Sequence, residues 1–448
     1  MPSCTRVHQA DTGQISSIIA KKINKQVHWN ISCFEDPMIT AYIQELICKP
    51  LTSESVVQIA LLNNPQIQAT FEELGIAQAD LVEAGLLSNP AFEVEVRYPH
   101  VKKLRTNIEY LVTAAFLDIF LVPLRTRLAT AELEQAKRRV TNEILNLAFE
   151  VRQTYYELLA AQQKLQYTKS IVELASIQGE ITLRQNKVGN INRLDFQQAR
   201  ARFLEANLEI AKGKTQIIRL TEKLNRYLGL SEGTCLHLTE KISEKIDYQG
   251  FDLCALESIA LRERLDLQEA RFEVIRFRRM LGLKEWWTFT NLSAGLAGER
   301  ETDGLNLVGY GLTGEFPIFN MGQATRMRIM AQLRQAQDRY LALEIRILSE
   351  VRESHNILIR NFEMIHNYRV QIIPLKHEIL NSSEELYNVM GLGIDRLLEY
   401  KRQELEMFQN YVEILKDYWL ARVQLDKAIG GYLFRLLSQE DCIEGIIE

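Results

Sequence analysis

The sequence predicts an α+β fold that is mainly α-helical and is built from two similar halves. Prolines and glycines are few, 9 and 22 in 448 residues, and long stretches lack both, which favours long helices. The chain matches itself at an offset of about 200 residues. Each half also holds two short segments of alternating polarity, the pattern of β-strands.

The internal match divides the chain. The offset drifts by only a few residues, so small insertions are enough to align the two halves. In each half a first helix is followed by two strands and then by a very long helical stretch. Matching segments are Ala60-Leu61 with Ala260-Leu261, Glu150-Val151-Arg152 with Glu350-Val351-Arg352, and Ile191-Asn192-Arg193-Leu194 with Ile394-Asp395-Arg396-Leu397. The predicted division is an N-terminal extension at 1–53, repeats at 54–250 and 251–435, and a tail at 436–448.

The first helices are expected from Ser55 to Leu87 and from Leu256 to Leu283. The strands that follow are expected at 92–98, 107–116, 288–299 and 305–316. In the first strand the apolar residues share one face, and Glu93, Glu95 and Arg97 share the other.

Each strand is about ten residues long, the length that a tilted strand needs to cross a bilayer. Two interpretations stay open: a soluble four-stranded sheet packed on helices, or part of a membrane barrel. Four strands cannot close a barrel, and an open edge cannot lie in lipid. The membrane interpretation therefore requires several protomers that pool their strands.

The long helices are predicted to form hairpins. From Leu124 to Lys187 there is no proline, and apolar residues recur at steps of three and four, a stripe of coiled-coil type. Such a helix would be about 90 Å long. A second helix, 194–228, follows a short turn in which Gly189 can supply a left-handed cap and Asn190 or Asn192 can cap the next helix. A similar turn runs from Val389 to Asp395 in the second half.

Several classes of function are excluded. The net charge of −5 and the lack of a basic stripe argue against nucleic-acid binding. The seven histidines are scattered, and no cluster typical of a metal site or a catalytic site is seen, so we expect no enzyme, cofactor or metal. A G-x-G-x-x-G pattern at 309–314 lies inside a strand pattern and does not open a helix, which argues against a nucleotide site.

The N-terminus leaves two alternatives. No run of about 18 apolar residues predicts a membrane helix, and no apolar core follows Met1 as in a signal peptide. The first alternative is a cytosolic protein. The second is a start site that lies downstream of a real signal sequence, with Cys4, after the small Ser3, as the lipidated first residue of a lipoprotein.

The residues resemble the TolC-like outer-membrane efflux family across about 50–435. Residues 60–65 match the family's A-L-x-x-N-P, residues 84–90 match A-G-x-x-x-N-P, and Val188 to Asp195 match V-G-x-x-x-x-x-D. The resemblance implies a homotrimer in the outer membrane that extends into the periplasm. It also implies a twelve-stranded β-barrel continued by a long periplasmic α-helical barrel.

The resemblance also assigns roles to residues. It implies a passive exit duct that contacts membrane lipid, a periplasmic adaptor protein and an inner-membrane pump. In family members acidic residues after the second tip form a constriction, and Arg396 and Glu399 fill those positions here. The implied sites are the adaptor-docking tips (Val188, Gly189, Asn190, Met390, Gly391, Gly393), the periplasmic gate (Asp195, Asp395, Arg396, Glu399), the barrel lumen (Glu93, Glu95, Arg97) and lipidation at Cys4.

One rival interpretation is a soluble or peripheral coiled-coil scaffold. It explains the long helices and the missing signal sequence, but it does not explain four amphipathic strands in two equivalent pairs. The genomic sequence upstream of Met1 distinguishes the two, because a lipoprotein signal that ends at Cys4 would favour the channel.

Overall fold

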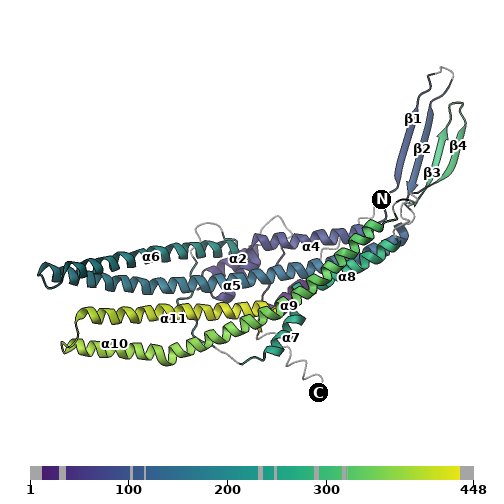
Figure 1. Ribbon diagram of the computed structural model, residues 1–448. Helices are drawn as coiled ribbons and strands as arrows, with labels where there is room; N and C mark the ends of the chain where they lie inside the picture. Colours follow the sequence, from purple (N-terminus) through teal and green to yellow (C-terminus); the bar gives the residue numbers. More distant parts are fainter. Residues whose placement is uncertain are drawn as a thin grey trace. The chain divides into compact units, whose positions relative to one another are not determined.

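The computed structural model describes residues 13–29, 37–100, 104–115, 118–230, 236–246, 250–286, 292–314, 319 and 321–433 (Figure 1). Cys4 and the predicted tail 436–448 lie outside these residues. After α1 (Gly13–Ile23) and α2 (Pro37–Ile47), the first half comprises α3 (Ser53–Asn63), α4 (Pro65–Ala84), β1 (Ala91–Arg97), β2 (Asn107–Ala114), α5 (Asp118–Lys187) and α6 (Arg193–Leu228). The second half comprises α7 (Leu253–Glu263), α8 (Leu265–Trp286), β3 (Leu292–Arg300), β4 (Asn306–Gly314), α9 (Gln323–Asn367), the π-helix η2 (Tyr368–Ile372), α10 (Ile373–Asn388) and α11 (Ile394–Ile429).

The predicted mainly helical fold with four strands is confirmed. Within the described residues, no helix combines the length and the apolar composition that a bilayer crossing requires. The described residues form two compact units, one within 70–140 and 265–344 and one within 13–69, 141–264 and 345–433. Both halves of the sequence contribute to both units, and the predicted division into 54–250 and 251–435 stays a prediction.

The single helix predicted from Ser55 to Leu87 is wrong in one respect, because the structure has two helices there, α3 and α4. Asn64 separates α3 from α4 with an extended backbone (φ −74°, ψ 118°). The residue before a proline is disfavoured in the α conformation, and Pro65 follows. The second half breaks in the same way at Arg264 (φ −69°, ψ 122°), although Leu265 follows it there.

At each break, a side chain forms hydrogen bonds to the end of a long helix of the same half. The Asn63 side-chain amide donates to the carbonyl oxygens of Leu228 (2.8 Å) and Gly229 (3.0 Å), just after α6. In the second half, Arg264 Nη1 donates to the carbonyl of Ala428 (3.3 Å) and to Glu350 Oε2 (2.6 Å). The helix breaks therefore serve as sockets in which α6 and α11 end.

The four strands form one antiparallel sheet in the order β1-β2-β3-β4. Its register separates two faces. One face carries apolar rows, of which the first is Phe92, Val112, Leu296 and Tyr310. The other face carries a row of three carboxylates, Glu95, Glu109 and Glu299.

The charged face is partly neutralised. Arg97 Nη2 lies 2.7 Å from Glu95 Oε2 and 3.6 Å from Glu109 Oε2, and the Asn107 amide donates to Glu299 Oε1 (2.7 Å). The alternation predicted for β1 is thus confirmed and extends across the sheet.

Close packing at a strand glycine occurs in β3, where a Cβ on Gly298 would meet the ring of Tyr110 at 2.2 Å. At Gly309 in β4 no atom lies within 4 Å of that position.

In the second unit, the long helices lie side by side as hairpins (Figure 1). Gln409 of α11 donates to Thr168 Oγ1 of α5 (2.9 Å), and the Tyr167 and Phe408 rings stack 5.7 Å apart. The helix predicted from Leu124 begins earlier, at Asp118, and contains Pro123.

Candidate functional site: the hairpin tips and the cavity behind them

The first tip joins α5 to α6 by a five-residue turn. Gly189 adopts the left-handed conformation (φ 78°), and the Asn190 amide donates to the Gln185 carbonyl (2.9 Å). Asn192 then caps α6, since its side-chain oxygen accepts from the Asp195 amide (2.8 Å). The cap predicted at Gly189 is confirmed, and Asn192 is the residue that caps the second helix.

The second tip follows the same path with different residues. Here the left-handed position is Met390 (φ 58°), and the Gly391 amide donates to the Leu386 carbonyl (2.8 Å). Gly393 occupies the cap position of α11 and has no side chain that could bond to the helix. A left-handed non-glycine residue is uncommon and costs about 1–2 kcal/mol. The second tip is therefore the more strained of the two.

The tips present apolar side chains to solvent. The Met390 side chain is 96% exposed. Three neighbours on the two tips are also exposed, namely Val188, Leu194 and Val389. Exposed apolar residues that gather at one place mark an interaction surface more often than single ones do.

Three of the predicted gate residues line one cavity of about 670 Å³ in the second unit. Asp395, Arg396 and Glu399 reach it from α11, at the start of that helix. Opposite them, α6 contributes Arg202 and Glu205. Asp195, the fourth predicted gate residue, is exposed and is not among the residues that line this cavity.

The cavity holds alternating charges along α11. Arg402 bonds both Glu399, one turn before it, and Glu406, one turn after it. The hydrogen bond from Arg402 holds the pKa of Glu399 below its ordinary value, and Arg202 of α6 acts in the same direction. Glu399 therefore stays ionised at neutral pH and gives the cavity wall a paired charge.

Sequence reasoning missed three charged members of this site, Arg402, Glu406 and Arg202. Arg402 and Glu406 stand at i+3 and i+7 from Glu399, a spacing that indicates neighbours on one helix face. Arg202 gave no such signal, because only the packing of α6 beside α11 brings it to the cavity.

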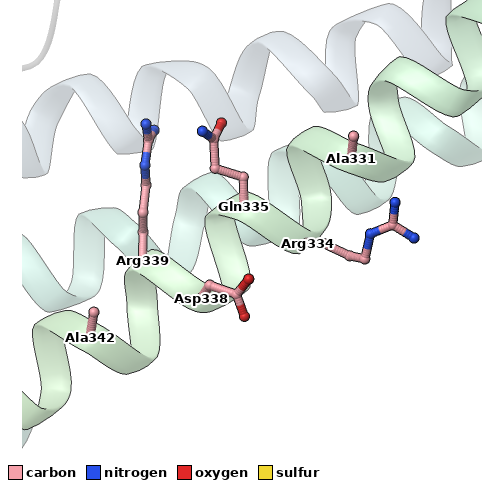
Figure 2. A pocket seen from close by; sticks show the side chains of 6 residues that line it. All are labelled: Ala331, Arg334, Gln335, Asp338, Arg339 and Ala342. Atoms are coloured by element: carbon pink, nitrogen blue, oxygen red, sulfur yellow. The ribbon is translucent and has the colours of Figure 1, made fainter.

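A second hollow, of about 500 Å³, lies on α9 and carries no comparable site. Figure 2 shows its lining residues along a single helix, with Gln335 and Arg339 pointing to the same side. One helix cannot enclose a ligand, so the hollow is part of an exposed helix face.

Comparison with known proteins gives three similarities. Residues 56–230 match the family model of the outer membrane efflux proteins. The chain is 21% identical over 402 residues to the cobalt-zinc-cadmium resistance protein CzcC of Cupriavidus metallidurans, covering 85% of this chain and 90% of that one. Two solved structures share the fold: CusC (TM-score 0.69, 17% identity, 90% and 97% covered) and the Campylobacter jejuni outer membrane channel CmeC (0.67, 16%, 85% and 85%).

The family match over residues 56–230, together with the order of helices and strands, supports a component of an outer-membrane efflux channel. The similarities confirm the resemblance to the TolC-like outer-membrane efflux family that was read from the sequence. This family is an efflux channel family and is not enzymatic. The coiled-coil scaffold is not favoured.

Proposed function

We propose that the chain forms a homotrimer that serves as the passive exit duct of a tripartite efflux system. Each protomer contributes its four strands to one twelve-stranded barrel in the outer membrane. The long hairpins form a helical barrel in the periplasm, and an inner-membrane pump delivers the substrate through a periplasmic adaptor. We retain the two sequence repeats, 54–250 and 251–435, as the domains of this protomer.

The single observation that carries the proposal is the sheet. It has two edge strands, β1 and β4, and one mainly apolar face. An open sheet edge cannot lie in lipid, whereas a closed ring of such sheets satisfies every edge. In that ring the apolar face meets lipid, and Glu93, Glu95 and Arg97 line the lumen.

The gate and the lipid anchor complete the proposal. Asp395, Arg396, Glu399 and the exposed Asp195 would narrow the periplasmic end, and their ion pairs would exchange partners when the hairpins move apart. Cys4 would carry the lipid.

An unheated gel tests the assembly. We expect the outer-membrane fraction of cells that express the full-length gene to give a band near three times 51.8 kDa that collapses to the monomer on boiling. A soluble monomer or helical dimer, made from a verified start codon, would contradict the proposal and favour the scaffold.

The tips give a second test. We expect Met390→Gly to weaken binding to a purified periplasmic adaptor about five- to thirtyfold, the effect of losing about 1–2 kcal/mol of apolar contact. Glycine accepts the left-handed conformation, so the turn itself should not be weakened. Met38→Ala is a matched control, because Met38 is also an exposed methionine but lies on α2. Equal adaptor affinity of the Met390→Gly variant and the wild type would rule out docking through this side chain.

A further inference from the structure

Three exposed arginines lie where α5 and α8 meet, close to the strands. Arg279 Nη1 of α8 donates to the carbonyl oxygen of Arg127 on α5 (2.9 Å), which holds the Arg279 guanidinium against α5. Arg278 stands next to Arg279 on α8, and all three side chains are exposed. Because α5 begins four residues after β2 and α8 ends six residues before β3, this arginine cluster lies near the foot of the two inner strands (Figure 1).

The arginine cluster has no acidic partner within the part of the chain that the structure describes. Residues 119–131 of α5 include two arginines, and residues 274–282 of α8 include three, with no aspartate or glutamate in either stretch. Glu273, the acidic residue that precedes the cluster on α8, lies 3.8 Å from Arg276. A group of like charges without counter-charges attracts an anion.

The cluster also stands below an exposed apolar surface. Phe120 precedes Arg127 by seven residues, which is two turns of α5, so the two side chains share a helix face. Phe120 is 71% exposed and Ile119 is 59% exposed. Aromatic side chains of this kind are enriched where a protein leaves the membrane. Since β2 and β3 are the inner strands, the cluster lies away from the edges β1 and β4, where protomers meet in the proposed barrel.

The spacing on this face fits a phospholipid. From Phe120 to Arg127 the helix rises about 10 Å, and the headgroup layer on each side of a bilayer is about 5–8 Å thick. An arginine just beneath that layer can lay its stem along apolar surface and place its guanidinium at the level of the phosphates. Guanidinium groups bind phosphate oxygens through paired, charge-assisted hydrogen bonds.

We propose that the arginine cluster binds the phosphate group of an anionic phospholipid in the periplasmic leaflet of the outer membrane. This site rests on the proposed function, which places the sheet in that membrane. It occurs once per protomer, because α4, the counterpart of α8 in the first half, has no basic residue. The trimer therefore has three such sites.

Native mass spectrometry of the full-length protein in a mild detergent tests the site with dioleoylphosphatidylglycerol as the probe. We expect up to three phosphatidylglycerol molecules per trimer and weaker binding of dioleoylphosphatidylcholine, which has no net charge. Replacing all three arginines of the cluster by glutamine should weaken phosphatidylglycerol binding at least tenfold, because each basic side chain near the membrane surface adds to the attraction. Wild-type affinity in this triple variant would overturn the site.

A matched control removes three exposed arginines from α6 and should bind phosphatidylglycerol as the wild type does. The control substitutions are Arg193→Gln, Arg200→Gln and Arg219→Gln. If the triple variant of the cluster does not assemble, Arg278→Gln alone carries the test, since Arg278 bonds to none of the described residues. Its affinity should fall at least threefold, and an unchanged affinity would overturn the site.

A fluorescence measurement tests which side of the wall the cluster faces. In a background where the six native cysteines are serine, Arg127→Cys is labelled with a nitrobenzoxadiazole group and reconstituted into vesicles. Phosphatidylcholine with a nitroxide on its headgroup should quench this label and should leave a label at Arg200→Cys unquenched. An unquenched label at position 127 would place the cluster on the lumen side and overturn the lipid site.

The outcomes separate this inference from the proposed function. A trimer on the unheated gel whose lipid binding does not depend on the cluster would overturn the lipid site and leave the duct intact. A monomer on that gel would overturn both. Displacement of phosphatidylglycerol by an equal concentration of glycerol 3-phosphate would show that the cluster recognises phosphate in solution, and would overturn its assignment to a lipid.

Discussion

Replacing Asp426 by alanine should destabilise the helical unit by about 3–5 kcal/mol, the usual cost of removing one partner from a buried ion pair. Asp426 Oδ2 accepts from Arg152 Nη1 at 2.9 Å, and both side chains are buried. Its other oxygen accepts from the Leu433 amide (3.0 Å) and lies 3.8 Å from Arg422 Nε. The variant would leave two guanidinium groups in the interior without this carboxylate.

The aromatic ring beside Arg152 cannot replace the lost charge. Arg152 lies 4.4 Å from the centre of the Tyr432 ring. Burial raises the pKa of the Tyr432 hydroxyl, so this group stays neutral at physiological pH and cannot serve as a counter-ion. The loss of this buried carboxylate should therefore appear as a lower free energy of unfolding.

Denaturant unfolding of the detergent-solubilised protein measures the effect as a lower midpoint. The matched control is Glu180→Ala, which removes a one-turn pair with Arg184 whose side chains are 64% and 76% exposed. That variant should change stability by less than about 0.5 kcal/mol, because exposed pairs contribute little. An Asp426→Ala protein as stable as the Glu180→Ala protein would show that the buried pair does not hold the helices together.

The elements with a local signal were predictable from sequence. The strand from Ala91 to Arg97 alternates with period two, and period two is a property of neighbouring residues, so its faces follow directly. The break at Asn64 also had a signal, the proline after it, which the helical periodicity on both sides concealed. The break at Arg264 had none, because its cause is the docking of α11 at Ala428, 164 residues away.

The same distinction applies to the tips. Gly189 was predictable as the left-handed residue because glycine is the residue that adopts this conformation without steric cost. In the second tip the left-handed residue is Met390, although glycines stand at 391 and 393. The position of the left-handed residue is set by where α10 ends and α11 begins. Both turns are five residues long. Strain at Met390 is thus a consequence of hairpin geometry and was not readable from composition.

The socket at the end of α6 leads to the last prediction, that Gly229→Ala destabilises the protein by about 3 kcal/mol or more. Gly229 is left-handed (φ 65°), which costs alanine about 1–2 kcal/mol. A Cβ there would also lie 2.4 Å from the Asn63 carbonyl oxygen and 3.0 Å from Pro65 Cδ, so backbone must move. That movement strains the bonds from Asn63 to the end of α6, each worth about 1 kcal/mol.

Two other glycines separate the contributions. Gly189 has a similar backbone (φ 78°) but no atom within 4 Å of the Cβ position, so Gly189→Ala should cost only the conformational term, about 1–2 kcal/mol. Gly430 ends α11 in the second socket, where the Cβ would meet the Glu263 carbonyl at 3.2 Å, so Gly430→Ala should fall between the two. Denaturant midpoints for the three variants give the order. Equal losses at Gly229 and Gly189 would mean that the first socket yields without cost and that α6 is held by its hairpin partner α5 alone.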